Sequence, residues 1–324
     1  MKRLLVPFGL ALLAATMLLA LAIGAVSIPV SDVWHALWGD GETQVVAIVR
    51  ELRAPRVVLA ALAGAALACS GAALQGTLRN PLAEPYLLGV SGGAAVGAVV
   101  ALTVGLATPA VVTLAAFGGA AVATVVVAML ARYAGGRAEP RLLLMAGVVV
   151  GAFANAVILV ALADSPPDRI RGALWWMMGS TADATWGAVA RTGAALLLLG
   201  GILVVRAREL DVLSLGEDPA VALGADVDRA ARRTFLVASW LAASTVAVIG
   251  LIGFVGLVVP NLARALGAHR HRPMLVVSAL YGGVLLVAAD IVARSVRAPI
   301  ELPLGAVTAL VGVPFFLARL RKLA

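Results

Sequence analysis

Long apolar blocks alternate with short polar segments along the whole chain. The blocks run for roughly 17 to 23 residues, which is the length that a helix needs to cross about 30 Å of hydrocarbon. The pattern predicts an all-α integral membrane protein whose single transmembrane domain covers residues 1–324 with ten spans. The predicted spans lie near Leu4–Val26, Val57–Gly76, Tyr86–Gly105, Pro109–Ala131, Leu142–Leu162, Ala188–Val205, Thr234–Leu251, Ile252–Ala268, Met274–Ala293 and Pro303–Ala318.

The composition agrees with this pattern. The chain is 62% hydrophobic and 13% charged, with a mean hydropathy of +1.03, whereas a soluble domain carries about 25% charged residues. Small residues are abundant, and in lipid they let helix backbones approach closely. Cys69 lies in such a small-residue block, where a lone thiol fits a packing role and supplies neither a disulfide nor a metal set.

The first apolar block has two interpretations. Lys2 and Arg3 precede it, and residues 22–25 loosely resemble a signal-peptide cleavage site. The block is longer than the 7 to 15 residues of a usual signal core. We therefore expect a retained first span.

The basic residues determine the expected orientation. With the N-terminus in the cytoplasm, 17 of the 25 Lys and Arg fall in inward segments, as the positive-inside rule requires. Both termini are then cytoplasmic, in the inner membrane of a bacterium, and no basic face is left for nucleic acid. The eight outward residues are Arg50, Arg53, Arg56, Arg169, Arg171, Arg191, Arg294 and Arg297.

The connecting segments fall into two groups in this orientation. The expected periplasmic loops are residues 27–56, 163–187 and 294–302, and the second contains Trp175 and Trp176, which favour a helix in the interfacial layer. The cytoplasmic segment 206–233 is long and polar. Within it, Asp218 before Pro219 predicts a capped helix start, and Gly224 predicts its end. Such a helix either packs on its own bundle or fits a partner protein, and the residues alone do not decide between these.

Two further segments have unusual sequences. In the turn 79–85, two prolines bracket a tight inner connection, and Arg79 with Glu84 gives it paired charge. In segment 250–264, three glycines and a proline interrupt an apolar stretch. Broken helices at membrane depth persist where protein or a water-filled cavity satisfies the freed backbone groups. This favours a transport protein over an inert anchor.

Four motifs together resemble the iron-chelate and cobalamin permease family of ABC importers, over essentially the whole chain. They are RNPLAEPYLLGVSGG, LSLGEDPAVALG, GLIGFVGLVVPNLAR and ELPLGAVTALVGVPFFL. The resemblance implies a homodimer of ten-helix subunits around a central pathway, with two ABC ATPase subunits below and a periplasmic substrate-binding protein outside. It implies no cofactor on this chain, since ATP and Mg would be bound by the ATPase subunits.

The resemblance also implies roles for individual residues. The cytoplasmic gate would include Asn80, Pro81 and Leu82, with a more doubtful second element at Glu139 and Pro140. The pathway-lining helix would present Met145, Val149 and Asn155. The segment that couples to the ATPase would comprise Leu213, Leu215, Gly216, Glu217, Asp218, Pro219, Val221, Leu223 and Gly224.

For the outer face, the resemblance implies that Arg53, Arg56 and Arg294 dock the binding protein, and Arg suits bidentate carboxylate partners. The alternative is local pairing, since Asp290 lies one helical turn before Arg294 and Glu51 lies beside Arg53.

Other functions fit the residues less well. A serine protease built on Ser91 lacks a base, because His35, His269 and His271 all lie in predicted loops. The sequence has no phosphate-binding loop, so ATP hydrolysis must come from another chain. An ion-coupled secondary transporter usually buries ionisable residues in its spans, and here Asp290 alone qualifies. As cargo we expect heme first and a ferric siderophore second, with cobalamin as the alternative.

Overall fold

The computed structural model describes residues 4–24, 26–135 and 140–320, and these form helices joined by turns, without a strand. Seven helical segments are long and apolar enough to cross a membrane. They are α1 (Leu5–Ala22), α4 (Ala54–Thr77), α6 (Pro109–Gly135), α7 (Pro140–Ala163), α9 (Trp186–Ala195) continued through α10 (Gly201–Val205), α13 (Val227–Ile249) and α15 (His271–Ser295).

Three shorter apolar helices occupy the remaining expected spans: α5 (Val90–Thr103), α14 (Val255–Ala265) and α16 (Leu304–Leu320). Each of the ten predicted segments therefore contains a helix, and the all-α membrane fold is confirmed. The interrupted stretch is also found, because α13 ends at Ile249 and α14 begins at Val255. The other helices are α2 (Val30–Trp38), α3 (Thr43–Ala47), α8 (Pro167–Met178), α11 (Ala207–Leu213) and α12 (Glu217–Ala222).

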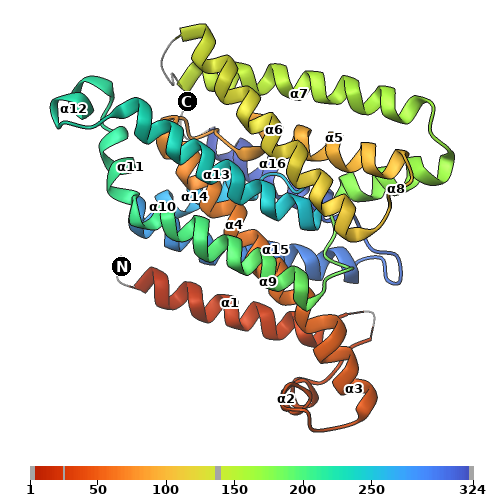
Figure 1. Ribbon diagram of the computed structural model, residues 1–324. Helices are drawn as coiled ribbons and strands as arrows, with labels where there is room; N and C mark the ends of the chain where they lie inside the picture. The colour runs from red at the N-terminus through yellow and green to blue at the C-terminus, as the bar shows by residue number, and fades with distance from the viewer. Residues whose placement is uncertain (1–3, 25, 136–139, 321–324) are drawn as a thin grey trace.

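The outer segment 27–56 is more ordered than a loop. It contains α2 and α3, and a wider helical turn over Ile48–Arg53 joins α3 to α4, so the second span begins well before Val57. Its Trp34 and Trp38 rings pack edge to face with centroids 6.1 Å apart. The segment therefore forms a small helical subdomain beside the bundle (Figure 1).

Helix α4 lies at the centre of the bundle and is buried over most of its length. Two glycines make its close contacts possible. A Cβ at Gly64 would stand 2.1 Å from the carbonyl oxygen of Gly282 on α15, and one at Gly71 would stand 2.0 Å from that of Gly256 on α14. Small residues thus let three backbones meet, as is usual in lipid.

Helix α1 is part of this bundle. It packs along α15, and its last carbonyls accept hydrogen bonds from two arginine side chains of other elements: Arg53 donates to Leu21 and Ala22, and Arg294 donates to Ala20. These contacts tie the end of α1 to the rest of the bundle.

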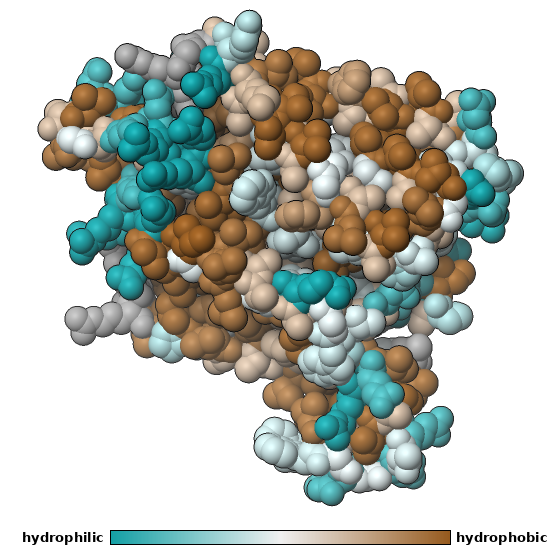
Figure 2. Space-filling view, viewed as in Figure 1, coloured by the Kyte–Doolittle hydropathy of each residue, from teal (hydrophilic) through white to brown (hydrophobic). Residues whose placement is uncertain are grey.

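The two ends of the bundle carry different elements. Helix α12, the start of α1, the end of α6 and the start of α7 lie at one end, and α2, α8 and the α15–α16 connection lie at the other (Figure 1). The visible face is mostly hydrophobic between these ends, and hydrophilic residues gather at the two edges (Figure 2). This distribution is typical of a bundle that spans a bilayer.

Candidate functional site

The predicted coupling segment forms a short helix, α12, between α11 and α13. It begins two residues earlier than the Asp218–Pro219 pattern indicated, because that pattern put the cap at Asp218 and the first helical residue at Pro219. Gly216, with φ of 109°, occupies the N-cap position, and Glu217 and Asp218 lie in the first turn. The correction has a simple reason: the backbone at the cap has a conformation that only glycine adopts easily, and acidic residues in the first turn stabilise the positive helix end.

The end of α12 agrees with the prediction. The N–H of Gly224 donates to the carbonyl of Val221 at 2.8 Å, and the N–H of Ala225 donates to that of Ala220 at 3.0 Å. Gly224 has φ of 78°. These two bonds around a left-handed glycine make a Schellman motif, which ends the helix sharply.

Helix α12 extends beyond the bundle (Figure 1) and has one anchored side and one open side. Leu213 and Ala220 are buried, whereas Leu215, Val221 and Leu223 are 58, 59 and 66% exposed. Three large apolar side chains on a polar end of the protein form a surface suited to a protein partner.

The predicted gate turn is held in a defined shape. The Asn80 side-chain oxygen accepts from the backbone N–H of Leu82 at 2.9 Å, and the Asn80 carbonyl accepts from Ala83 at 3.0 Å. Helix α14 ties the turn to the bundle, because the Asn261 amide donates to the carbonyl of Pro81 at 3.0 Å. Leu82 remains exposed at the tip. Of the second gate element, Glu139 lies outside the described residues, and Pro140 is the first residue of α7.

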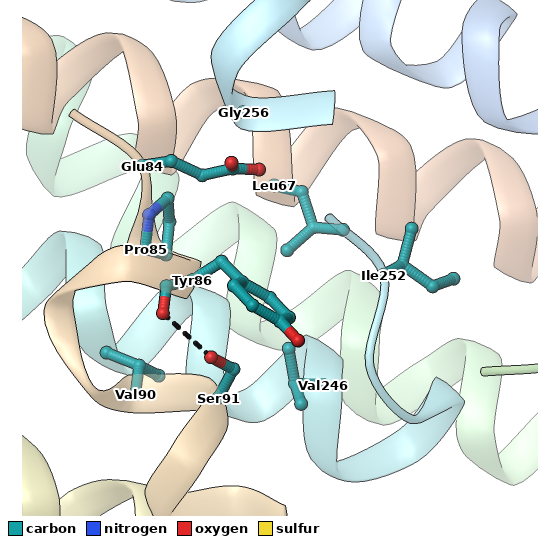
Figure 3. Close-up of a pocket in the computed structure, with 9 residues that line it drawn as sticks. All are labelled: Leu67, Glu84, Pro85, Tyr86, Val90, Ser91, Val246, Ile252 and Gly256. Atoms are coloured by element: carbon teal, nitrogen blue, oxygen red, sulfur yellow. Dashed lines mark hydrogen bonds between the residues drawn. The ribbon is translucent and has the colours of Figure 1, made fainter. Parts of the chain in front are cut away.

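Glu84 does not pair with Arg79, contrary to the expectation from sequence. Its side chain is buried in a small pocket with Tyr86, Leu67 and Gly256 (Figure 3). There its carboxyl accepts from the backbone N–H of Phe254, the cap residue of α14. A carboxyl group is buried in an apolar pocket only with a hydrogen-bonding partner. Here the N-terminal end of α14 supplies that partner. Ser91 beside it donates to the Tyr86 carbonyl at 2.9 Å, as Figure 3 shows.

The predicted pathway residues all lie on open surface of α7. Met145 and Val149 are 65 and 61% exposed, and Asn155 is exposed further along. An apolar groove of about 710 Å³ runs beside them between α5, α6 and α7. Within the part of the chain that the structure describes, no element covers this face.

The three arginines expected at the docking surface are held within the subunit. Of the alternative local pairs, Asp290–Arg294 is present, whereas Arg53 binds backbone carbonyls and Arg56 binds Asp290 and Glu301. Arg53 and Arg294 are only 8 and 6% exposed. Arg53 donates to the carbonyls of Leu21 and Ala22, at 2.7 and 3.1 Å, and to that of Val26. Buried guanidinium groups need several acceptors, and the end of α1 provides them.

Arg56 and Arg294 belong to one ion cluster at the end of the bundle that carries α2. Arg56 binds Asp290 through two nitrogens, at 2.9 to 3.1 Å, and Glu301 through its two terminal nitrogens, at 2.6 and 2.9 Å. Thr181 donates to Asp290 at 2.7 Å, and the Arg294 Nε lies 3.5 Å from its other oxygen. The cluster joins α4, α15 and the segments before α9 and α16, so it holds the outer ends of the helices together.

Sequence reasoning missed two groups of polar side chains at the end of the bundle that carries α12. In the first, the Gln75 amide donates to the Gly256 carbonyl at 3.0 Å, while Arg264 donates to Gln75 and, at 3.0 Å, to Asn261. In the second, His271 binds Asp211. The spacing of Asn261 and Arg264 on one helical face was a usable signal for the first group. No sequence signal links His271 to a residue 60 positions away.

The comparisons with known proteins all indicate the same family. The FecCD transport family matches residues 12–322. The cobalamin import permease BtuC of Halobacterium salinarum is 42% identical over 99% of this chain and 86% of its own, and the hemin transport permease HmuU of Yersinia pestis is 36% identical over 97 and 94%. The Fe(3+) dicitrate permease FecD of Escherichia coli is 37% identical over 98% of both chains.

A solved structure has the same fold throughout. It is an inward-facing conformation of a putative metal-chelate type ABC transporter, with a TM-score of 0.88 and 28% identity over 99% of this chain and 100% of that one. The helical bundle is therefore shared along the full length. The chain belongs to the FecCD transport family and is a permease subunit of a type II ABC importer for metal chelates or vitamins.

Proposed function

We propose that two copies of this chain form the membrane channel of an importer that moves heme, or secondly a ferric siderophore, from periplasm to cytoplasm by alternating access. Two ATPase subunits bind at the α12 end, and a substrate-binding protein delivers cargo at the α2 end. The α12 end, with both termini, faces the cytoplasm of a bacterial inner membrane. The observation that carries the proposal is α12 itself, which presents exposed apolar side chains beyond the bundle.

The open face of α7 supports a homodimer with a central pathway. Met145, Val149 and Phe153 are exposed there, next to the apolar groove. A second copy facing this surface would enclose a passage between two α7 helices, with Leu82 of each gate turn near its inner end. An apolar wall binds cargo weakly, which suits release of a large ligand whose selection takes place in the binding protein.

The cargo assignment rests on the chemistry of this wall. A flat, mostly apolar ligand such as heme passes along Met, Val and Phe side chains without stripping many hydrogen bonds. Relatives are named for hemin, ferric citrate and cobalamin. Cobalamin is the alternative cargo, and it is larger and carries more amide groups.

Ion coupling is the rival mechanism, and the state of Asp290 argues against it. This carboxylate was the one candidate coupling residue in a span, and it is bound by Arg56 and lies beside Arg294. A coupling acid must exchange its ion during transport, whereas this one is fixed by two cations and a threonine.

Uptake by the reconstituted complex tests the proposal. The permease, its ATPase and its binding protein are placed in proteoliposomes, and heme, a ferrichrome-type chelate and cobalamin are compared with and without ATP. We expect ATP-dependent accumulation that is fastest for heme. Accumulation driven by a proton or sodium gradient without ATP would contradict the ABC mechanism, and faster cobalamin uptake would reassign the cargo.

Two substitutions, one in α12 and one at its C-cap, test whether this segment binds the ATPase subunits. The double variant Val221→Ser, Leu223→Ser is expected to weaken binding of the ATPase subunits by about tenfold to a hundredfold, since each apolar side chain contributes roughly 1.5 kcal/mol when buried. The affinity is measured with purified permease in detergent. Val296→Ser removes an equally exposed apolar side chain at the other end and should leave the affinity unchanged; equal losses in both would refute the assignment.

A further inference from the structure

The coupling segment and the gate turn touch each other at the inner end of the bundle. The guanidinium of Arg79, the first residue of the gate turn, lies beside Gly216, the cap of α12; a Cβ at Gly216 would stand 3.7 Å from its Nη1. Arg79 itself has a positive φ of 48°. The two segments that the proposed function places at the ATPase and at the gate are therefore neighbours.

A second connection runs through Asp211 and His271. One carboxylate oxygen of Asp211, on α11, accepts from the backbone N–H of His271 at 2.9 Å and from its ring Nδ1 at 2.8 Å. His271 is the first residue of α15 and is buried. Because the carboxylate only accepts hydrogen bonds, Nδ1 carries the proton and the other ring nitrogen faces away from Asp211.

That other nitrogen lies against α4. A Cβ at Gly76 would stand 2.4 Å from the His271 Nε2, so the ring occupies the space of a side chain at this position. Gly76 is in the last turn of α4, three residues before Arg79. A shift of the imidazole therefore presses directly on the backbone that leads into the gate turn.

The gate turn is also held by α14. Asn261 donates to the carbonyl of Pro81, and Arg264 binds both Asn261 and Gln75. The turn is thus tied to α14, and the His271 ring lies against the last turn of α4, just before the gate turn. On the α11 side, the Asp211 carboxylate is bonded directly to the start of α15.

We propose that the Asp211–His271 pair is the mechanical joint through which movement of α12 reaches the gate turn, with His271 bearing on Gly76. The inference rests on the proposed function of α12 and of the turn. Helix α11 ends at Leu213 and α12 begins at Glu217, so a displacement of α12 by an ATPase moves α11 over a connection of three residues. Asp211 and His271 act as positioning residues and touch no cargo.

The rate of disulfide crosslinking between the two gate turns tests this coupling, and the experiment does not require the cargo to be known. Leu82→Cys is introduced in a Cys69→Ser background, and the full complex with its ATPase is reconstituted. Formation of a disulfide between the introduced cysteines of the two subunits is followed with and without ATP, together with the rate of ATP hydrolysis. In the parent complex, ATP should change the crosslinking rate.

His271→Ala should reduce the ATP-induced change in crosslinking rate by about threefold or more, the size that coupling residues commonly show, while ATP hydrolysis stays within about twofold. His271→Asn, whose amide can replace the Nδ1 donor, should restore part of the response. His269→Ala is the matched control, because this exposed histidine lies two residues away.

The outcomes separate the two proposals. If ATP has no effect on the crosslink in the parent complex, the proposed function fails. If the parent responds and His271→Ala responds equally, the joint is refuted. Should His271→Ala fail to assemble, Asp211→Asn in the assembled complex decides: an undiminished response refutes the joint, and a diminished response with retained hydrolysis supports it.

Discussion

Replacement of Asp290 by Asn is expected to lower the free energy of unfolding by about 3 kcal/mol or more, because removal of one partner leaves buried charges uncompensated. Asp290 is buried and serves Arg56, Arg294 and Thr181 at once. Asn has the same shape, but its amide nitrogen would face guanidinium donors where a carboxylate oxygen now accepts. Glu301 would still pair with Arg56, whereas Arg294 would be left with the backbone carbonyl of Ala20.

The measurement is the midpoint of thermal unfolding of the purified permease in detergent. A drop of roughly 5 to 10 °C is expected for a chain of this size. Asp183→Asn is the matched control, since Asp183 is an exposed aspartate near the outer end. Equal midpoints for the Asp290 variant and the parent would show that the cluster does not hold the helix ends together.

Replacement of Gly71 by Ala is expected to cost about 3 kcal/mol, at the upper end of the range for overpacking a well-packed core. The added methyl would lie 2.0 Å from the carbonyl oxygen and 2.5 Å from the Cα of Gly256. Both are backbone atoms, so no side-chain rotation relieves the clash and α4 must move away from α14. That movement would also strain the bond from Gln75 to the Gly256 carbonyl.

The same substitution at Gly118 provides the control. Gly118 lies within α6, and no atom beyond its own stretch of helix lies within 4 Å of the position of its Cβ. Gly118→Ala should be neutral or slightly stabilising, because alanine is the better helix former. Comparable thermal losses for the two variants would mean that loss of glycine flexibility matters more than the α4–α14 contact.

Much of the fold could be predicted from the sequence. Ten segments were expected to span, and a helix lies in each, because the transfer of an apolar block into lipid depends on the composition of that block alone. The end of α12 could be predicted for a similar reason: a left-handed Gly224 closes a helix through bonds to its own last turn. Both are local properties.

The candidate site was predictable only where it is local. The short helix and the Asn80 turn were found, but the partners of the arginines were not fixed. Arg56 meets Asp290 across 234 positions, and His271 meets Asp211 across 60. When an arginine has no acidic residue close to it in the sequence, the sequence does not show which distant carboxylate or helix end will bind it.

The sequence by itself determined that this is an all-helical membrane permease, that its inner segment forms a short helix, and which family it resembles. The tertiary structure alone decided that Arg53, Arg56 and Arg294 are bound within the subunit, that Gly71 and Gly76 are contact points, and that Arg79 lies beside Gly216 at the start of α12. The physical reason is that hydropathy and helix caps are set by neighbouring residues, whereas ion pairs and close backbone contacts arise only when distant helices pack together.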